Sequence, residues 1–576
     1  MSISDLSEQE IGRRQSLQAL RDAGINPYPA EEFPTNAFST EIIESFSDEE
    51  QIQRQVCIAG RIMSRRIMGK ASFMELQDSE GRIQVYISRD AICPDENDKE
   101  LYNTVFKKLL DIGDFIGIKG YVFRTQMGEI SVHAESLTVL AKTLRPLPVV
   151  KEKDGEIFDA FSDPELRFRQ RYVDLVVNSQ IKEIFRKRTQ VFNSMRQFFN
   201  DRGYMEVETP VLQSIPGGAA ARPFITHHNA LDIPLYLRIA DELYLKRLIV
   251  GGFEGVYEFS KNFRNEGMDR THNPEFTAME IYVAYKDYNW MMSFTEQMLE
   301  KIALEVNGTT ETKVGDQLIS FKAPFKRITM IDSIHENTGI DINGMDENGL
   351  REVCKKIGVE HDPSMGKGKL IDEIFGAKCE GKYIQPTFIT DYPYEMSPLC
   401  KRHRNNPELT ERFELMINGK ELANAYSELN DPIDQFDRFQ EQLKLAEKGD
   451  DEAMFIDTDF IRALEYGMPP TSGMGIGMDR LVMILTGQTT IQEVLFFPQM
   501  RPEKIIKKDA ATAYTEIGIP EDWVTVLQKA GYIMVENLKG LSPGKLHQEL
   551  CGLNKKNKLE LTNPTLDQVS SWIANL

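Results

Sequence analysis

Residues 54–141 contain the pattern that restricts the fold most strongly. Short runs of alternating apolar and polar residues, among them "VCIAGRI", "RIQVYIS" and "DFIGIKGYVF", recur between turn-forming residues. Alternation with a period of two predicts strands with one buried face. One stretch with helical spacing, "DKELYNTVFKKLL", lies between the third and the fourth of five such runs. Five strands interrupted by one helix predict a small β-barrel of the oligonucleotide-binding type.

A second, larger domain is predicted after the proline-marked linker "LRPLPVV" at 144–150. Apolar residues recur at helical spacing over residues 181–202, and Gly203 provides the stop. Strand and helix patterns then alternate through residue 290 and resume near 412–487. In the last of them, "SGMGIGMDRLVMILTG", we expect a glycine-rich turn that leads into a helix.

These patterns predict an α+β protein in four parts. The first two parts are an N-terminal helix and linker, residues 1–53 (with 25–53 as the linker), and the barrel, 54–145. The third is the large domain, 146–504, with an insertion near 307–380. The fourth is a helical extension, 505–576, in which short helices and glycine turns alternate as in helix–hairpin–helix modules.

Composition excludes several classes of protein. The 576 residues contain no run close to the roughly 18 apolar residues that a membrane span needs. The six cysteines form no C-x-x-C pair, so we expect reduced thiols in a cytoplasmic protein rather than disulfides or a zinc site. The net charge of −21 argues against nucleic-acid binding over the whole surface, but residues 54–70 contain five basic residues and no acid, which favours a local basic face.

Three widely separated stretches share one kind of chemistry. "FRNEGMDRTHNPEF" (263–276) offers Arg264 and His272 to phosphate groups and Phe276 as a flat surface for a base. "NGKELANAYSELND" (418–431) offers Glu421 and Glu428, and "GMGIGMDR" (473–480) offers Arg480 beside glycines. Arginine binds phosphate through two parallel hydrogen bonds, and carboxylates suit Mg²⁺. Together these stretches predict a nucleoside triphosphate held by arginines and metal ions, although each alone is as well explained by a solvated turn or a charged rim.

The usual phosphate-binding loops are missing from the sequence. It has neither G-x-x-x-x-G-K-[ST] nor a G-x-G-x-x-G that follows a strand. A Walker-type ATPase and a dinucleotide-binding fold are therefore disfavoured.

In its motifs the chain resembles the class II aminoacyl-tRNA synthetases, and most closely the lysine-specific branch of their lysyl, aspartyl and asparaginyl subgroup. The likeness extends from about residue 54 to 502. "FRNEGMDRTHNPEFTAMEIYVAY" resembles the second motif of that class, "GMGIGMDRL" the third, and the 181–202 helix with "GYMEVETPVL" the first. "IPGGAAARPFITHHNALD" and "LRIADELYLKRL" are close to the lysine-specific sequences. The resemblance implies an antiparallel sheet flanked by helices, an anticodon-binding barrel and ATP-dependent attachment of lysine to the 3′ end of its tRNA.

The resemblance also implies roles for individual residues. It makes Arg264 and Arg480 catalytic and assigns Mg²⁺ to Glu421 and Glu428. ATP would be held by Arg264, Glu266, His272, Asn273, Phe276, Glu421 and Arg480. Lysine would be held by Gly218, Glu242, Glu280, Tyr282, Asn424, Tyr426 and Glu428. A pocket for an ammonium group needs carboxylates, because burial of an unpaired charge is costly. The alternative for Glu242 and Glu280 is a structural ion pair with Lys246 or Lys286.

Anticodon binding and assembly follow from the same resemblance. Phe73 would stack on a base, Gln84 and Glu129 would form hydrogen bonds with bases, and the arginines of 54–70 would contact the RNA backbone. The alternative for Phe73 is a place in the core. The first motif implies a homodimer. The 505–576 extension departs from the usual bacterial pattern, and RNA binding and protein docking are both open for it.

Three rival functions share part of this pattern. An aspartate or asparagine enzyme would need a cationic pocket, whereas Glu242, Glu280 and Glu428 provide negative charge. A non-catalytic RNA-binding paralogue would be expected to lack Arg264, Arg480 or the carboxylates, and all are present. A protein-modifying relative would be expected to lack the barrel.

Overall fold

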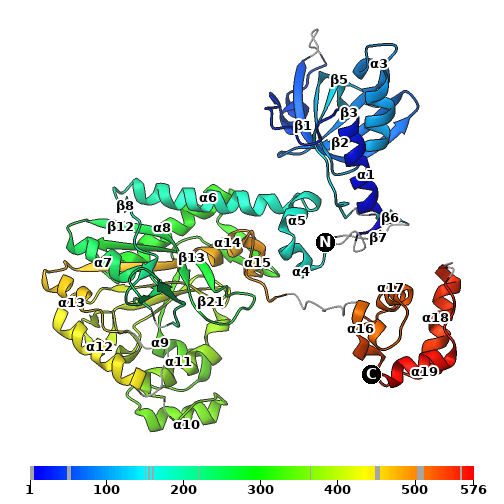
Figure 1. The fold of residues 1–576 in the computed structure, drawn as a ribbon. Helices are drawn as coiled ribbons and strands as arrows, with labels where there is room; N and C mark the ends of the chain where they lie inside the picture. The colour runs from blue at the N-terminus through cyan, green and yellow to red at the C-terminus, as the bar shows by residue number, and fades with distance from the viewer. Residues whose placement is uncertain are drawn as a thin grey trace. The chain divides into compact units, whose positions relative to one another are not determined.

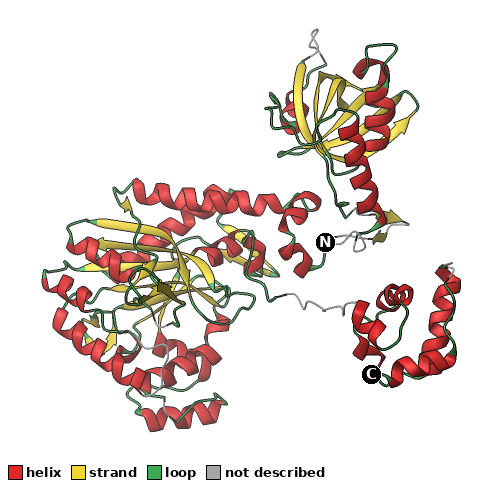
Figure 2. Cartoon of the chain, in the orientation of Figure 1, coloured by secondary structure: helices red, strands yellow, loops and turns green. Residues whose placement is uncertain are grey.

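The computed structural model describes residues 6–48, 54–148, 151–153, 156–158, 161–219, 221–363, 365–447, 455–502, 511–557, 559 and 561–576. The chain divides into two compact units, one up to Gln499 and one from Met500 onward. Strands gather in a barrel and in one large sheet of the first unit, whereas the second unit is helical (Figure 1, Figure 2). The predicted α+β class is confirmed. The end of the proline-marked linker, the predicted boundary after residue 53 and the one at 504/505 fall at residues outside these ranges and stay predictions.

The barrel has the five expected strands, closed in the order β1-β2-β3-β5-β4, with helical segments between the third and the fourth. Alternate side chains, such as Met74, Val85 and Val132, fill its interior, and the intervening ones face outward. Its elements are β1 (Gln55–Met68), β2 (Ala71–Gln77), β3 (Arg82–Ser88), α3 (Arg89–Ile92), the π-helix η2 (Leu101–Leu109), β4 (Phe115–Arg124) and β5 (Ile130–Ala141).

The prediction of a linker over 25–53 is wrong for its described residues, which pack on the barrel. The helix α2 (Ser39–Ser45) lies in this segment, and the backbone N–H of Ser39 donates to Asp78 at 2.6 Å. Ile42 is buried in the barrel core. The segment has too few apolar residues for a recognisable period, and both side-chain-to-backbone hydrogen bonds and the burial of Ala37 and Ile42 fix it on the barrel.

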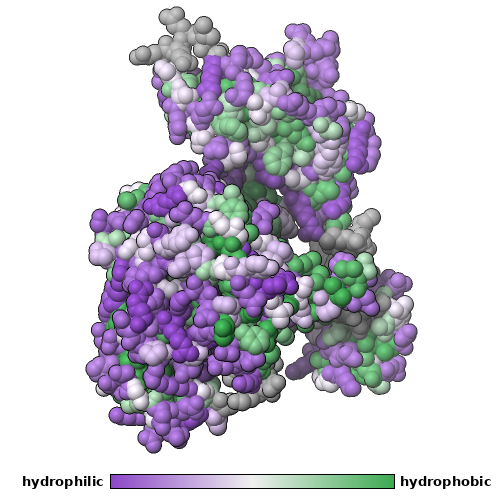
Figure 3. All heavy atoms as spheres, turned by 90° about the vertical axis from the view of Figure 1, so that its left-hand side faces the viewer, coloured by the Kyte–Doolittle hydropathy of each residue, from purple (hydrophilic) through white to green (hydrophobic). Residues whose placement is uncertain are grey.

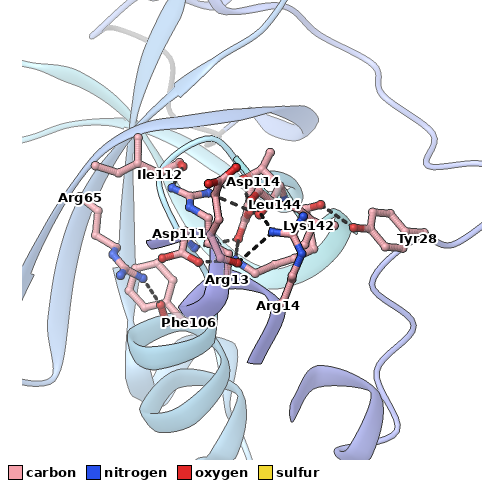
Figure 4. Close-up of polar contacts among 12 residues, drawn as sticks. Arg13, Arg14, Tyr28, Arg65, Phe106, Asp111, Ile112, Asp114, Lys142 and Leu144 are labelled. Carbon is pink, nitrogen blue, oxygen red and sulfur yellow. Dashed lines mark hydrogen bonds and ion pairs between the residues drawn. The ribbon is translucent and has the colours of Figure 1, made fainter. Parts of the chain in front are cut away.

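A buried polar network attaches the first helix, α1 (Glu8–Asp22), to the barrel (Figure 4). The Arg13 guanidinium donates to the Ile112 carbonyl at 2.8 Å and to Thr143 Oγ1 at 2.6 Å. Beside it the fully buried ammonium of Lys142 pairs with Asp114 at 2.8 Å and with Asp111. This barrel lysine, with its two carboxylates, is far in the sequence from the site described below.

The large sheet has eight strands in the order β16-β17-β20-β21-β22-β13-β12-β8. Only the outermost pairs, β16 with β17 and β12 with β8, are parallel. The strands are β8 (Met205–Glu206), β12 (Gly255–Phe263), β13 (Glu275–Ala284), β16 (Lys326–Thr329), β17 (Thr387–Thr390), β20 (Arg412–Ile417), β21 (Lys420–Ser427) and β22 (Thr471–Gly477).

The two faces of this sheet differ in chemistry. One face, with Ile281, Met474 and Ala425, belongs to the main hydrophobic core together with side chains of α6 (Ile181–Asn200), α8 (Tyr288–Asn307) and α14 (Met478–Leu485). On the intervening positions of the same strands stand Glu280, Gly475 and Asn424. Polar and glycine positions are therefore collected on the face away from the core.

The glycine-rich stretch is a central strand, so the expectation of a turn there is wrong. Its glycines alternate with Met474 and Ile476, which point into the core. Glycine and apolar residues therefore alternate with the period of two that is typical of a strand. Because positions 473, 475 and 477 are glycines, no side chain projects from them onto the polar face of the sheet. The helix that follows it, α14, begins at Met478 as expected.

The segment predicted as an insertion near 307–380 contributes a strand to the main sheet. Its strand β16 pairs with β17, which follows the segment, and both strands share a second hydrophobic cluster with its helices. The helices are α9 (Met330–Thr338), α10 (Glu347–Ile357), α11 (Lys367–Lys378) and η3 (Glu380–Lys382), and the hairpin β14 (Glu311–Val314) with β15 (Gln317–Ser320) precedes them.

Shorter elements complete the first unit. A three-stranded sheet has the order β10-β11-β9, and α7 shares a hydrophobic cluster with α12 and α13. The elements are β6 (Lys151–Lys153), β7 (Glu156–Phe158), α4 (Pro164–Arg169), α5 (Arg171–Val177), β9 (Leu212–Gln213), β10 (Ile225–His228), β11 (Ile233–Leu237), α7 (Glu242–Val250), η4 (Tyr394–Met396), β18 (Arg402–His403), β19 (Asn406–Thr410), α12 (Pro432–Glu447), α13 (Thr458–Glu465) and α15 (Ile491–Val494).

The C-terminal unit has its own core of Tyr514, Trp523, Leu546 and Trp572 among other apolar residues. Its helices are α16 (Ala511–Glu516), α17 (Glu521–Lys529), η5 (Val535–Leu538), α18 (Pro543–Asn557) and α19 (Leu566–Ala574). In both units, no helix in the described ranges is long and apolar enough to span a bilayer. The face of the molecule in Figure 3 is mostly hydrophilic, with small groups of hydrophobic residues.

Candidate active site

Three neighbouring strands form the floor of the candidate site. Asn424, Gly475 and Glu280 lie side by side across β21, β22 and β13, and Tyr426, Gly473 and Tyr282 form the next row. A Cβ atom on Gly473 would lie 2.2 Å from Glu428 Oε1 and 2.3 Å from the Tyr282 ring. Only glycine fits there, because its missing side chain leaves room for both neighbours.

Three buried carboxylates stand on this floor, and they are the three predicted to receive the lysine ammonium. Glu280 accepts hydrogen bonds from the Asp241 backbone N–H at 3.1 Å and the Tyr282 hydroxyl at 3.0 Å. Glu242, the first residue of α7, accepts one from the Tyr426 hydroxyl at 2.6 Å. Burial, followed by nearby acids, raises the pKa of Glu280 well above its usual value. The cluster is short of positive charge, which favours a cationic ligand.

Among the described residues, Lys246 is the cation that pairs with carboxylates of this cluster. Its ammonium, fully buried, lies 2.5 Å from Glu242 and also pairs with Glu428. The second oxygen of Glu428, Oε1, is buried over the backbone of Gly473, whose N–H hydrogen-bonds to the Glu428 carboxylate. The alternative role of Glu242 as a partner of Lys246 is therefore correct. For Glu280 no ion pair is formed within the described residues.

The backbone of Gly218 lies against Glu242. Gly218 has φ +87°, and a Cβ there would lie 3.1 Å from the Cβ of Glu242. The residue predicted to close over the amino acid is thus at the edge of the carboxylate cluster. On the opposite row, Asn424 accepts a hydrogen bond from Arg412 at 3.1 Å.

Arginines gather at the other end of β13. Arg264 follows β12, and its guanidinium lies 5.1 Å from the centre of the Phe276 ring. Its Nε is buried and forms no hydrogen bond in the described structure. Because Phe276 and Glu280 are four residues apart on β13, they point to the same face of the sheet. The arginine end and the carboxylate end therefore share one face.

His272 links the loop between β12 and β13 to Arg480, which lies on α14 just after the glycine-rich strand β22. Arg480 Nη2 lies 3.0 Å from His272 Nε2, and Arg480 Nη1 donates to the Glu421 carbonyl at 2.6 Å. The other ring nitrogen of His272 lies 2.8 Å from Asp269. Although burial acts to raise it, the pKa of Asp269 is lowered by the Thr271 backbone N–H and by His272. Stretches more than 200 residues apart are thus joined at one place.

Two other residues predicted to bind ATP have different surroundings. Asn273 is buried, and its side chain donates to the Glu275 carbonyl at 2.6 Å and accepts from the Gln499 N–H at 3.1 Å. It therefore holds the loop in place. Glu266 is exposed on the loop.

The two residues predicted to bind Mg²⁺, Glu421 and Glu428, lie far apart. They are near opposite ends of the extended strand β21, and seven residues of strand span about 23 Å. One ion therefore cannot contact both. Glu428 is instead the partner of Lys246.

Glu414 stands beside Glu421 instead. The register of β20 with β21 shifts between Leu415 and Met416, and both Leu422 and Ala423 are buried in the main core. This bulge turns Glu421 to the same face as Asn424. Burial and then the charge of Glu421 raise the pKa of Glu414 to about 7. Two adjacent carboxylates suit Mg²⁺, which takes one or two of them and leaves its other positions to phosphate and water.

A pH-dependent stability follows from the raised pKa of Glu414. The folded state holds this proton more tightly than the unfolded chain, where the pKa is near 4.5. Its stabilising effect is complete below about pH 4.5 and is lost as the pH rises through about 7. We expect Glu414→Gln to raise the Tm at pH 8 in buffer without Mg²⁺, with a smaller gain at pH 5. Glu414 also pairs with Arg412 at 2.6 Å, and an equal decrease of the Tm at both pH values would show that it serves mainly as the partner of this arginine.

The residues predicted to read the anticodon share the outer face of the barrel. Phe73 is half-buried there, not in the core, and its ring centre lies 5.1 Å from that of Tyr86. Tyr86 is in register with His133, and His133 stacks on Tyr121 at 4.8 Å. The sequence interpretation missed this aromatic row, although each member occupies an outward position of a predicted strand.

Polar groups flank the aromatic row. The Gln84 amide donates to Ser131 Oγ at 2.8 Å, and Ser131 Oγ lies 3.4 Å from the Glu129 carbonyl at the β4–β5 turn. The three predicted residues therefore lie on neighbouring strands and their connecting turn.

The expected basic face of residues 54–70 is smaller than predicted. Arg54 pairs with Glu41 at 2.5 Å, Arg61 donates to the Gly113 carbonyl at 2.8 Å and Arg65 donates to the Phe106 carbonyl. Arg66 and Lys70 are exposed. Arg54 thus fixes the barrel to α2, whereas Arg61 and Arg65 bond to backbone carbonyls within the barrel domain.

Comparison with known proteins agrees with this geometry. Residues 163–501 match the model of the class II tRNA synthetases (D, K and N), and residues 56–140 match an OB-fold nucleic acid binding domain. The chain therefore belongs to the class II tRNA synthetases. Residues 502–575 match a domain of unknown function.

Relatives with high sequence identity show which branch of the class the chain belongs to. A lysine–tRNA ligase of Porphyromonas gingivalis is 74% identical over 573 residues, 99% of each chain. One of Christiangramia forsetii is 70% identical over 97% of each chain, and one of Azobacteroides pseudotrichonymphae is 71% identical over 87% of this chain and all of its own. Within its class the chain belongs to the lysine–tRNA ligases.

Proposed function

We infer that the chain is an ATP-dependent lysine–tRNA ligase, which forms lysyl-adenylate and pyrophosphate and then transfers lysine to the 3′ end of its tRNA. The observation that carries this function is the cluster of Glu242, Glu280 and Glu428, buried on the same sheet face as Arg264. An acidic or neutral amino acid would add no positive charge to three buried carboxylates, of which Lys246 pairs with only two. The rival aspartate and asparagine specificities are disfavoured for this reason.

We propose that lysine lies over Gly475, next to the Glu428 carboxylate and the Tyr282 ring that cover Gly473. Its ε-ammonium is directed to Glu428 Oε1 and the Tyr282 hydroxyl, while Glu242, Glu280, Asn424, Tyr426 and Gly218 line the remainder. The three buried carboxylates, of which Lys246 pairs with two, support this placement because the cluster has more negative than positive charge.

ATP is proposed to occupy the arginine end of the same face. Phe276 offers a ring for stacking with adenine, Arg264 lies over that ring to contact the α-phosphate and the lysine carboxylate, and Arg480 with His272 clamps the far phosphates. Glu421 together with Glu414 would hold Mg²⁺, which neutralises phosphate charge when bound. Glu266 remains a proposed ATP contact on the loop.

The reaction requires no nucleophile or general base from the protein. The lysine carboxylate, already ionised, attacks the α-phosphorus, and the bond to the departing pyrophosphate breaks. A ribose hydroxyl of the tRNA end then attacks the carbonyl carbon of lysyl-adenylate and releases AMP. The residues contribute by alignment and by stabilising charge that develops on the phosphate.

The outer face of the barrel is proposed to bind the anticodon. A row of half-exposed aromatic rings gives stacking surfaces, and Gln84 and Glu129 offer hydrogen-bonding groups. We expect Phe73→Ala to weaken tRNA binding by about 1–3 kcal/mol, that is, roughly 5- to 150-fold in the Kd. Pyrophosphate exchange, which needs no tRNA, should be unchanged. Equal losses in both assays would contradict a role confined to RNA.

A homodimer is also proposed. Around β8 to β11 several apolar residues are exposed, namely Met205, Val211, Leu212, Ile225, Leu231 and Ile233. Large exposed apolar groups close together are typical of protein interfaces. A particle of twice 65.9 kDa is expected in light scattering, and a particle of 65.9 kDa would contradict the proposal.

We further propose that the protein works in the cytoplasm, in keeping with its six free cysteines.

Amino-acid-dependent pyrophosphate exchange tests the function directly. Exchange is expected with lysine, ATP and Mg²⁺ and not with aspartate or asparagine. Exchange with none of the amino acids would favour the RNA-binding paralogue. Charging of tRNA in the same preparation separates the ligase from an enzyme that modifies proteins.

A further inference from the structure

The carboxylate cluster contains an ammonium group of its own, and no step of the lysine reaction uses it. Lys246 extends from α7 into the cluster, and its side chain is fully buried. Its ammonium lies 2.5 Å from Glu242 Oε1 and pairs with Glu428 Oε2. Burial alone would lower the pKa of Lys246, but the charges of Glu242 and Glu428 raise it above its usual range. The group is therefore a permanent cation.

The contacts of Lys246 and Tyr426 occupy three of the four carboxylate oxygens of Glu242 and Glu428. Lys246 occupies one oxygen of Glu242, and the Tyr426 hydroxyl occupies the other at 2.6 Å. Lys246 also occupies Glu428 Oε2. Glu428 Oε1 lies beside the Tyr282 ring over the backbone of Gly473, whose N–H hydrogen-bonds to the Glu428 carboxylate.

We propose that Lys246 is a positioning residue for amino-acid specificity: it ties Glu242 to Glu428 and so fixes the place of Glu428 Oε1, the oxygen proposed to receive the ammonium of the substrate. The inference rests on the proposed lysine site. Two buried carboxylates without a cation between them repel each other, or share a proton, and either change moves Glu428 Oε1 from this place. The enzyme's own lysine thus fixes the depth at which the substrate's ammonium can bind.

The variant Lys246→Met tests this proposal, because it removes the charge and keeps most of the volume. We expect the Kd for lysine, measured by calorimetry without ATP, to rise at least tenfold, while the KM for ATP stays within twofold of wild type. Discrimination against ornithine, whose ammonium is one methylene shorter, should decrease. A lysine Kd that is unchanged or lower in a folded Lys246→Met would overturn the proposal.

Lys142→Met is the matched control. It also deletes a fully buried ammonium that pairs with two carboxylates, Asp111 and Asp114, but in the barrel (Figure 4). It should lower the Tm by a similar amount and leave the Kd for lysine unchanged. An equal loss of lysine affinity in both variants would show a general effect of destabilisation and would contradict a positioning role.

A second variant covers the case in which Lys246→Met does not fold. Lys246→Gln keeps two N–H donors for the carboxylates without the charge, and the proposal predicts an intermediate loss of lysine affinity at an unchanged KM for ATP. A wild-type Kd in this variant would contradict the need for a charge. Wild-type enzyme that lacks lysine-dependent exchange would instead refute the proposed function itself.

Discussion

Lysine-dependent pyrophosphate exchange is expected to fall about 10²- to 10³-fold when Arg480 is replaced by alanine, which is the range typical of the loss of one preorganised charge-stabilising group. Arg480 is the third residue of α14, and its guanidinium lies between His272 and the Glu421 carbonyl. Two protein groups thus hold it in a fixed direction before ATP arrives. The loss should appear mainly in kcat, since the charge on the phosphates increases as the bond to pyrophosphate breaks.

Arg66→Ala is the control for this variant. Arg66 is an exposed arginine of the barrel, and pyrophosphate exchange requires no tRNA. Its exchange rate should match wild type. An Arg480→Ala enzyme with a wild-type Tm and an exchange rate within threefold of wild type would contradict the role of Arg480.

The second large effect is expected from Gly473→Ala. The added Cβ would lie 2.2 Å from Glu428 Oε1 and 2.3 Å from the Tyr282 ring, so at least one of them must move. Overpacking of this kind costs about 1–3 kcal/mol of stability. Because the displaced groups are the proposed ligands of the lysine ammonium, we expect the KM for lysine to rise more than tenfold.

Gly475→Ala is a matched comparison on the same strand and face. Its added Cβ would come no closer than 3.8 Å to a neighbour, Glu280 Cγ. Its Tm should stay close to wild type, whereas that of Gly473→Ala should decrease. Equal Tm values together with a wild-type KM for lysine in Gly473→Ala would contradict the packing described for Glu428 and Tyr282.

Much of the fold could be predicted from local patterns. Barrel strands such as "RIQVYIS" alternate strictly, and the 181–202 helix has one continuous apolar face, so both patterns predicted the observed elements. The "GMGIG" strand was misread because glycine usually marks a turn. Its alternation with methionine and isoleucine was the signal that favoured a strand, and a strand in the centre of a sheet with a bare face is uncommon.

The site was predictable in its residue types but not in its pairings. The resemblance assigned Mg²⁺ to both Glu421 and Glu428, yet the bulge at Leu422 and the length of β21 separate them. The neighbour of Glu421 is Glu414, which comes from the adjacent strand, and strand register is a long-range property that a single sequence does not display. The partnership of Lys246 with Glu242 was visible as a spacing of four on a helix, but its bond to Glu428 was not.

The most direct test of the central claim is a crystal structure with lysine and a non-hydrolysable ATP analogue. The account predicts lysine over Gly475, with its ε-ammonium within hydrogen-bonding distance of Glu428 Oε1 and its carboxylate beside Arg264 and the α-phosphate. Lysine bound with its ammonium away from Glu280 and Glu428, or triphosphate bound on the other side of the sheet from Arg264 and Arg480, would contradict it.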